Sequence, residues 1–142
     1  MLQHHMQETY RYLFDEAHSA LNQAGSFRPF GAGTRKTGEQ IQTLVDQAAA
    51  AGPQDHIRGL IAGFREDDKQ NGLIAAGLVF DGQMGDANGE HSRALVFHLE
   101  AANGRAVEVV VPYVKHVGDI FDFGEPVVTE VQPEIFLDAA QP

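Results

Sequence analysis

The chain has 142 residues, of which 43% are hydrophobic and 21% charged, a composition typical of a folded single domain and unlike that of disordered chains. Ten Lys and Arg residues against twenty Asp and Glu residues give a formal net charge of −10, which disfavours binding to nucleic acids and to membrane surfaces. The absence of cysteine excludes disulfides, thiolate metal sites, iron–sulfur clusters and a cysteine nucleophile.

The whole chain, 1–142, is expected to form one domain with disordered ends at residues 1–7 and 137–142. The N-terminal residues show no basic segment followed by an apolar one, which is the pattern of a secretory signal peptide. The longest apolar runs are also far shorter than the about 20 residues that cross a bilayer. These observations predict a soluble, cytoplasmic protein.

The first predicted element is an amphipathic helix over residues 8–24, because apolar side chains recur there at spacings of three and four. Gly25 suits the position just past its C-terminus, where a left-handed residue ends a helix at low cost. The next segment, Phe27–Arg35, is rich in aromatic residues and contains Pro29, which cannot donate a hydrogen bond to a neighbouring strand. This segment is therefore predicted to be a strand at or near the edge of a sheet.

A tight turn is expected next, and Gln40–Gln47 is then either the return strand of a hairpin or, continued into Ala48–Ala51, a short helix. The hairpin is the favoured interpretation. Gly52 and Pro53 interrupt the chain before a second amphipathic helix, predicted over residues 53–70. Its apolar stripe follows the i, i+3, i+4, i+7 pattern and consists of Ile57, Leu60, Ile61 and Phe64.

The remainder of the chain is predicted to be all β. Its strand candidates are Leu73–Phe80, Ala94–Glu100, Ala106–Tyr113 and a shorter one at Val127–Val131. A long loop, Gly82–Ser92, is expected between the first two.

The middle pair of these strands can be aligned from the side-chain pattern alone. A short loop that places Gly104 in the left-handed position of a bulged turn puts apolar residues opposite one another on one face. The pairs on that face are Leu99 with Val107, Phe97 with Val109 and Leu95 with Val111. The other face then carries His98 opposite Glu108 and Val96 opposite Val110, a mixed surface that half faces water or a partner.

The predicted fold is thus α+β, a two-layer sandwich in which a mostly antiparallel sheet of about five strands carries two helices on one face, in the order α-β-β-α-β-β-β. The open edge of such a sheet needs cover, and pairing of two copies is a common way to provide it. A homodimer is therefore expected. The candidates for its interface are the aromatic residues expected near sheet edges or in loops: Phe27, Phe30, Phe121 and Phe123. The alternative is that all of them fill the core.

Five short segments of the sequence resemble segments of one group of proteins. They are Phe27–Ala32 (FRPFGA), Gly77–Asp81 (GLVFD), Val96–Glu100 (VFHLE), Val111–Tyr113 (VPY) and Pro133–Phe136 (PEIF). Together they resemble a group of small bacterial proteins of unknown function. The resemblance covers most of the chain between Phe27 and Phe136 and implies the same order of strands, including a strand at Gln40–Gln47. It implies no activity, cofactor or catalytic residue.

Histidine is the first residue type to consider for chemistry, because it titrates near neutral pH and is the commonest metal ligand. On the predicted hairpin, His98 and Glu100 share one strand face with Glu108 beside them, so this group can bind a divalent metal or act as acid and base. A solvated cross-strand ion pair is the structural alternative. A second candidate metal site is the glycine-rich loop that contains Asp86 and His91, whose oxygen and nitrogen atoms suit a divalent cation.

Tyr113, His116 and Asp119 follow one another at three-residue steps at the end of a strand, where such a group can orient a small ligand. The alternative for Tyr113 is a half-buried aromatic ring with its hydroxyl group in water. The motifs of serine hydrolases and of phosphate-binding loops are absent from the sequence. No cofactor is therefore expected.

The leading functional prediction is a non-enzymatic binding domain that self-associates. The first alternative is an immunity- or antitoxin-like acidic protein, because residues 116–142 include six Asp and Glu but no Lys or Arg and can face a basic partner protein. The second alternative is a small metal-dependent enzyme that uses His98 with Glu108, or His91 with Asp86.

Overall fold

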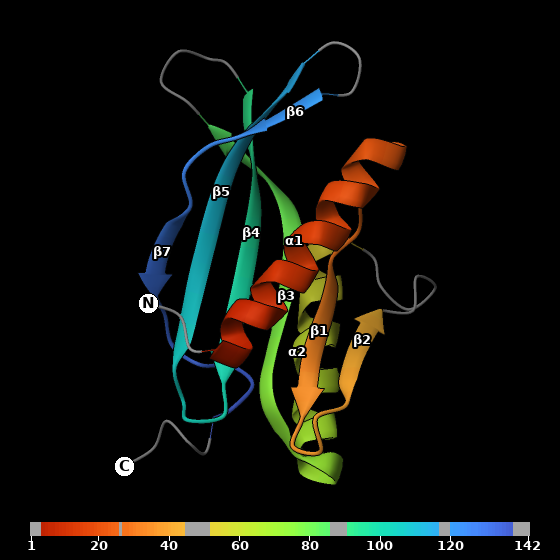
Figure 1. The fold of residues 1–142 in the computed structure, drawn as a ribbon, viewed down its shortest axis with the longest axis vertical. Helices are drawn as coiled ribbons and strands as arrows, with labels where there is room; N and C mark the ends of the chain where they lie inside the picture. Colours follow the sequence, from red (N-terminus) through yellow and green to blue (C-terminus); the bar gives the residue numbers. More distant parts are fainter. Residues whose placement is uncertain (1–3, 26, 45–51, 86–90, 117–119, 138–142) are drawn as a thin grey trace.

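The computed structural model describes residues 4–25, 27–44, 52–85, 91–116 and 120–137, which form an α+β fold (Figure 1). The helices are α1 (His4–Ala24) and α2 (Pro53–Asn71). The strands are β1 (Phe30–Arg35), β2 (Gln40–Leu44), β3 (Leu73–Gly85), β4 (His91–Ala101), β5 (Ala106–His116), β6 (Ile120–Phe123) and β7 (Val127–Glu130). Neither helix in the described part of the chain is both long enough and apolar enough to cross a membrane.

All the strands join one 7-stranded antiparallel sheet, which confirms the predicted class. They lie in the order β2-β1-β3-β4-β5, and β6 and β7 both pair with β5, at different places along it. The sheet is thus larger than the about five strands predicted. β6, of 4 residues, is absent from the predicted strands, whereas the equally short β7 matches the strand predicted at Val127–Val131.

The hairpin of β1 and β2 confirms the strand interpretation of the segment that begins at Gln40, up to Leu44; residues 45–51 lie outside the described part. β1 is the second strand of the sheet, paired with the edge strand β2 on one side and with β3 on the other, which confirms the near-edge position of the two that were expected. Pro29 lies just before the strand, so its missing N–H removes no hydrogen bond from the sheet.

The predicted register of β4 and β5 is confirmed, with Leu99 opposite Val107 and the other expected pairs in step. Gly104 takes the left-handed conformation expected in this turn, with φ of 91°. Both β3 and β4 are longer than predicted, since β3 continues to Gly85 and β4 begins at His91. Much of the predicted loop between them is therefore strand.

The prediction that both helices pack on one face of the sheet is wrong. Leu13 of α1 belongs to a core with Phe97 and Val109, whereas Phe64 of α2 belongs to a core with Leu78. Successive residues of a strand point to opposite faces, so these two cores lie on opposite sides, called here the α1 face and the α2 face. Figure 1 shows α1 in front of the sheet and α2 behind it.

Small residues in β1 and β3 explain how the sheet accepts a helix on each face. A Cβ atom at Gly31 would lie 2.7 Å from the ring of Phe64 on α2, and one at Gly77 would lie 3.2 Å from Thr9 on α1. The glycines therefore let both helices approach the central strands closely. Consecutive residues of β1 are buried as a result, a pattern without alternation that is typical of strands covered on both sides.

The predicted disorder of residues 1–7 is wrong for the part that the structure describes. α1 begins at His4, and Met6 is fully buried in the core of the α1 face. Burial of an apolar side chain of this size contributes about 1.5–3 kcal/mol, which stabilises the first turns of the helix. At the other end Leu137 is described and 43% exposed, whereas residues 138–142 lie outside the described part.

Candidate functional site

The α2 face carries an apolar area that neither helix covers. α2 contacts β1, β2 and β3, so the side chains that β4 and β5 direct to this face have no helix over them. Val114 and Val127 are 56% and 58% exposed. We call this area the valine patch, and it consists of Phe80, Val96, Val110, Pro112, Val114 and Val127.

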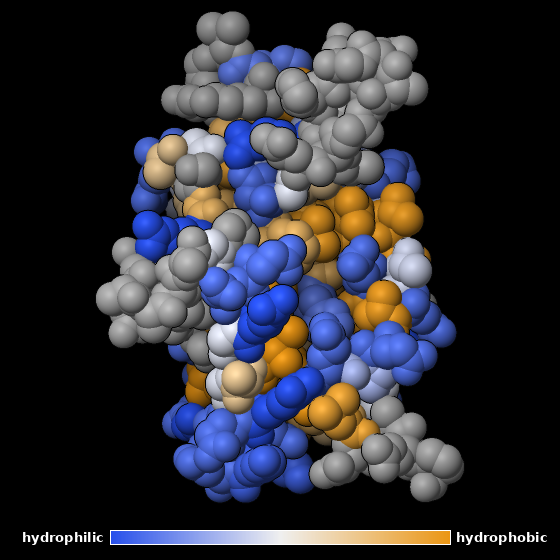
Figure 2. Space-filling model, turned by 180° about the vertical axis from the view of Figure 1, so that it is seen from behind, coloured by the Kyte–Doolittle hydropathy of each residue, from blue (hydrophilic) through white to orange (hydrophobic). Residues whose placement is uncertain are grey.

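Strand register places these side chains on one face. Val96 is paired with Phe80 on β3 and with Val110 on β5, and Val110 is paired in turn with Val127 on β7. Phe80 also packs against the core beneath α2, which identifies the face. Figure 2, the view from behind, shows hydrophobic surface over this part of the sheet, bordered by hydrophilic side chains. The mixed surface predicted from the register is thus the α2 face of β4 and β5.

A buried carboxylate lies on the same face of β4. Glu100 is fully buried, and its Oε2 lies 2.5 Å from Nε2 of His98. The backbone N–H groups of Glu134, Ile135 and Phe136 donate to its two oxygens at distances from 2.7 to 3.1 Å. Burial alone would raise the pKa of Glu100, but these hydrogen bonds outweigh it and hold the pKa below the ordinary value of 4.5. The ionised carboxylate therefore fastens the C-terminal segment to the sheet.

The structure pairs His98 with Glu100 rather than with Glu108. Glu108 lies opposite His98 in the register, but His98 bonds to Glu100, and Glu134 is the next carboxylate at 3.9 Å. The solvated cross-strand ion pair considered as the alternative is not the contact observed either, because His98 pairs with Glu100 of its own strand and the two side chains are 13% and 0% exposed. Among the described residues, no group of three His, Cys, Asp or Glu side chains is arranged to hold a metal ion.

The structure does not bring Tyr113 and His116 together. They are three residues apart on β5, so their side chains point to opposite faces of the sheet. Tyr113 belongs to the core of the α1 face, whereas Nε2 of His116 lies 2.7 Å from Oδ2 of Asp122 at the surface. The other predicted site positions lie outside the described part of the chain: Asp119, Asp86 and the side chain of His91.

Tyr113 is instead part of a buried polar group on the α1 face. Its hydroxyl group donates to Oδ1 of Asp81 at 2.7 Å, and Asp81 forms an ion pair with Arg93, whose guanidinium carbon lies 5.5 Å from the centre of the Tyr113 ring. Burial and the Asp81 carboxylate raise the pKa of Tyr113 well above its ordinary range. The expectation of a hydroxyl group in water is wrong, since Tyr113 is 2% exposed.

The phenylalanines predicted to form an interface pack against the core of the α1 face. Phe30 is 7% exposed, and the ring of Phe27 lies 5.6 Å from it. The ring of Phe123 lies 5.0 Å from that of Phe14 on α1, and Phe121 packs against the same core. The most exposed apolar surface of the described residues therefore includes the valine patch rather than these aromatic side chains.

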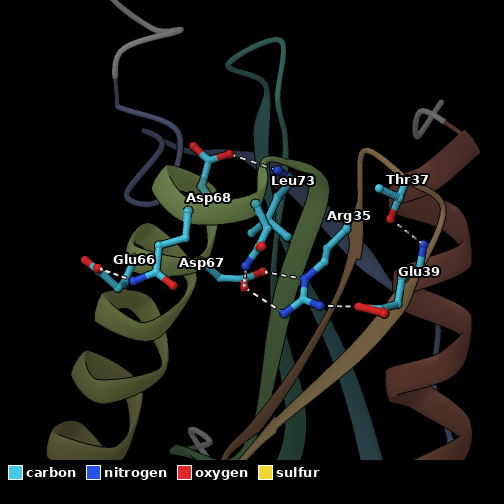
Figure 3. Close-up of polar contacts among 9 residues, drawn as sticks. Arg35, Thr37, Glu39, Glu66, Asp67, Asp68 and Leu73 are labelled. Carbon is cyan, nitrogen blue, oxygen red and sulfur yellow. Dashed lines mark hydrogen bonds and ion pairs between the residues drawn. The ribbon is translucent and has the colours of Figure 1, made fainter.

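A second polar group fixes the C-terminal end of α2 against the sheet (Figure 3). Nε and Nη2 of Arg35 donate to the two oxygens of Asp67, at 3.3 and 2.8 Å, and Glu39 pairs with the same guanidinium. The hydrogen bonds from Arg35 hold the pKa of Asp67 below its ordinary value. Oδ1 of Asp68 accepts the N–H of Leu73 at 2.9 Å, where α2 turns into β3. These contacts explain the position of the helix end without any ligand.

The acidic residues of segment 116–142 that the structure describes are at the surface. The side chains of Asp122, Glu130 and Glu134 are 73%, 79% and 55% exposed. Recognition of a basic partner through these carboxylates stays a prediction.

Comparison of the chain with protein-family models, with curated proteins and with solved structures finds no match. The resemblance to the group of small bacterial proteins therefore stays a prediction. Function must be inferred from the geometry of this chain.

Proposed function

We propose that this protein is a non-enzymatic binding domain that forms a homodimer through the valine patch. The observation that carries this proposal is the exposure of apolar side chains on neighbouring strands of the α2 face. Large exposed apolar areas mark sites of association. We also keep the expectation of a cytoplasmic location, with which a chain that lacks cysteine is consistent.

The size of the patch suits the centre of a dimer interface. Its residues extend over neighbouring strands about 4.8 Å apart and over half of β5 at about 3.4 Å per residue, which gives a footprint of about 400 Å². A stable dimer buries about 800 Å² on each partner. Polar residues around the patch, such as Glu108, Thr129 and Asp122, would supply the rest, because ordinary interfaces surround an apolar centre with a polar rim.

The uncharged valine patch allows a second copy of the chain to be the partner in spite of the net charge. A net charge of −10 makes contact between two copies unfavourable wherever carboxylates meet. The valine patch contains no charged residue, so the centre of the interface holds no carboxylates, and Glu108 and Asp122 lie only at its rim. A symmetric dimer also requires a self-complementary surface, which a sheet face of valine side chains offers, since two sheets pack face to face about 10 Å apart.

The test compares two valines that are neighbours on β7 but point to opposite faces. Val127 belongs to the valine patch and is 58% exposed, whereas Val128 lies on the α1 face and is 52% exposed. Sedimentation equilibrium measures the dimer dissociation constant of the unchanged chain and of each lysine variant. Val127→Lys should raise this constant at least about tenfold, because a symmetric interface would then hold two like charges. Val128→Lys should leave it within about twofold.

A monomer at every concentration measured would overturn the proposal, and so would a dimer that both lysine variants weaken equally. The same measurement at low and high salt distinguishes association through the valine patch from association through the exposed carboxylates. Association of two acidic chains through the valine patch should stay the same or strengthen as salt screens their repulsion, whereas association of exposed carboxylates with a basic partner weakens as salt screens the attraction.

A further inference from the structure

Three of the basic residues of this acidic chain line one cavity beside the C-terminal end of α2. Its volume of about 470 Å³ falls within the about 300–1,000 Å³ typical of ligand sites. Lys36, Arg65 and Lys69 form its charged side, and Asp68 is the acidic residue among the described lining. We call this cavity the basic pocket.

Contacts with the backbone orient two of these cations. The backbone N–H of Lys36 donates to the carbonyl of Gly72 at 3.1 Å, and the stem of the Lys36 side chain passes over Gly72, where a Cβ atom would lie 2.9 Å from the lysine Cδ. Gly72 has φ of 76°, a conformation that favours glycine, and its lack of a Cβ atom leaves room for the lysine stem. Nε of Arg65 donates to the carbonyl of Glu134 at 2.5 Å. The basic side of the pocket is therefore largely preformed.

The positive charge of the pocket is only partly balanced. Within the described residues, neither Lys36 nor Lys69 has an ion-pair partner. Asp68 offsets one charge, and its Oδ1 is engaged by the N–H of Leu73 at 2.9 Å. The lining thus keeps an excess of positive charge in a chain whose net charge is −10, and this excess attracts an anionic group.

Apolar residues also line the pocket. They are Leu73, Ile135 and Phe136, which are buried in the core beneath α2, and Leu137, which is 43% exposed. Glu100 holds Ile135 and Phe136 in place through their backbone N–H groups. A ligand with a charged end and an apolar body would therefore find both cationic and apolar partners in this lining.

We propose that the basic pocket binds an amphipathic anion, a carboxylate joined to an apolar chain. Its charged end lies against Lys36 and Lys69, and its apolar part lies against Phe136 and Leu137. The pocket and the valine patch share no residue, so this inference goes beyond the proposed dimer and does not depend on it.

Isothermal titration calorimetry with small probes tests the proposal. Octanoate should bind at low salt with a dissociation constant of about 1 mM or tighter. Octylamine, with the same chain and the opposite charge, and inorganic phosphate, an anion without a chain, should each bind at least about tenfold more weakly.

Charge substitutions locate the binding site. Lys36→Gln combined with Lys69→Gln should weaken octanoate binding about fivefold for each lysine removed, from the Coulomb attraction between charges about 4 Å apart in water. The matched control is Arg58→Gln, which removes one positive charge from a side chain of α2 that is 79% exposed and outside the pocket. This control should leave octanoate binding unchanged.

No octanoate binding, binding that the double substitution leaves unchanged, or phosphate binding as tight as that of octanoate would each overturn the proposal. Nuclear magnetic resonance of the unchanged chain gives a readout that does not depend on the folding of any variant. Octanoate should shift the backbone N–H signals of Leu73 and Phe136, and the absence of these shifts would also overturn it.

Discussion

Replacement of Glu100 by glutamine should destabilise the fold far more than the similar size of the two side chains suggests. Each carboxylate oxygen of Glu100 accepts hydrogen bonds from two or more donors, which are the N–H groups of residues 134–136 and the ring of His98. In glutamine an NH₂ group replaces one of these two oxygens. This group donates and cannot accept, so the N–H groups that bonded to that oxygen lose their acceptor. Loss of about two charge-assisted bonds at about 1.5 kcal/mol each lowers the free energy of unfolding by about 3 kcal/mol.

Urea denaturation followed by circular dichroism measures this loss. The matched control is Glu108→Gln, on the same face and opposite His98, which should stay within about 0.5 kcal/mol of the unchanged chain. Hydrogen exchange should also become faster at the N–H groups of Ile135 and Phe136, which Glu100 binds. A loss below about 1 kcal/mol for Glu100→Gln, or a loss equal to that of the control, would refute the reasoning.

The lowered pKa of Glu100 predicts the direction of the acid response. A carboxyl group whose pKa is lower in the folded chain than in the unfolded chain adds stability above its ordinary value, here 4.5, and this stability is lost as pH falls through the folded value. The urea concentration at which half of the unchanged chain is unfolded should therefore decrease when the pH is lowered below 4.5. Glu100→Gln should show a smaller fall, and equal falls in the two chains would contradict the assignment.

Three further substitutions test other parts of the fold by the same urea assay. Gly77→Ala should cost about 2 kcal/mol, because its Cβ atom would lie 2.7 Å from a leucine of β4, whereas Gly82→Ala, with its nearest atom at 3.4 Å, should cost less than half of that. Asp67→Asn should cost about 1 kcal/mol by weakening the paired bonds from its arginine, and Asp55→Asn, whose arginine is 3.9 Å away at the surface, should cost less than about 0.5 kcal/mol. Tyr113→Phe should cost about 1–2 kcal/mol at neutral pH. Because the pKa of this phenol is raised on folding, its contribution is present below the ordinary value of 10.0 and is lost as pH rises above it, so the variant should lose less stability in alkali than the unchanged chain.

The pairing of β4 with β5 could be predicted from the sequence because it depends on a local rule. Strand side chains alternate between two faces, and a slip of one residue would move Leu99 and Val107 out of the core. The same local logic located α2, which spans Pro53–Asn71 against a prediction of 53–70.

The faces on which the helices pack could not be predicted in this way. α1 and α2 each have one apolar side, and this periodicity does not indicate which side of the sheet that side covers. Glycines at positions 31 and 77 let the helices approach the two faces of the sheet closely. This role could not be inferred from the sequence, because it depends on the position of β1 beside β3 in the folded chain.

The candidate site likewise has some features that follow from the sequence and others that depend on the tertiary structure. The sequence by itself determined the charge, the absence of thiol chemistry, and the mixed face of β4 and β5 on which His98 and Val96 lie. Only the tertiary structure decided that Glu100 is buried, because its backbone donors come from residues 34 to 36 positions further along the chain. It also decided that the valine patch is exposed, since α2 contacts β1, β2 and β3. Alternation and periodicity are properties of neighbouring residues, whereas burial depends on which distant segments lie over a side chain.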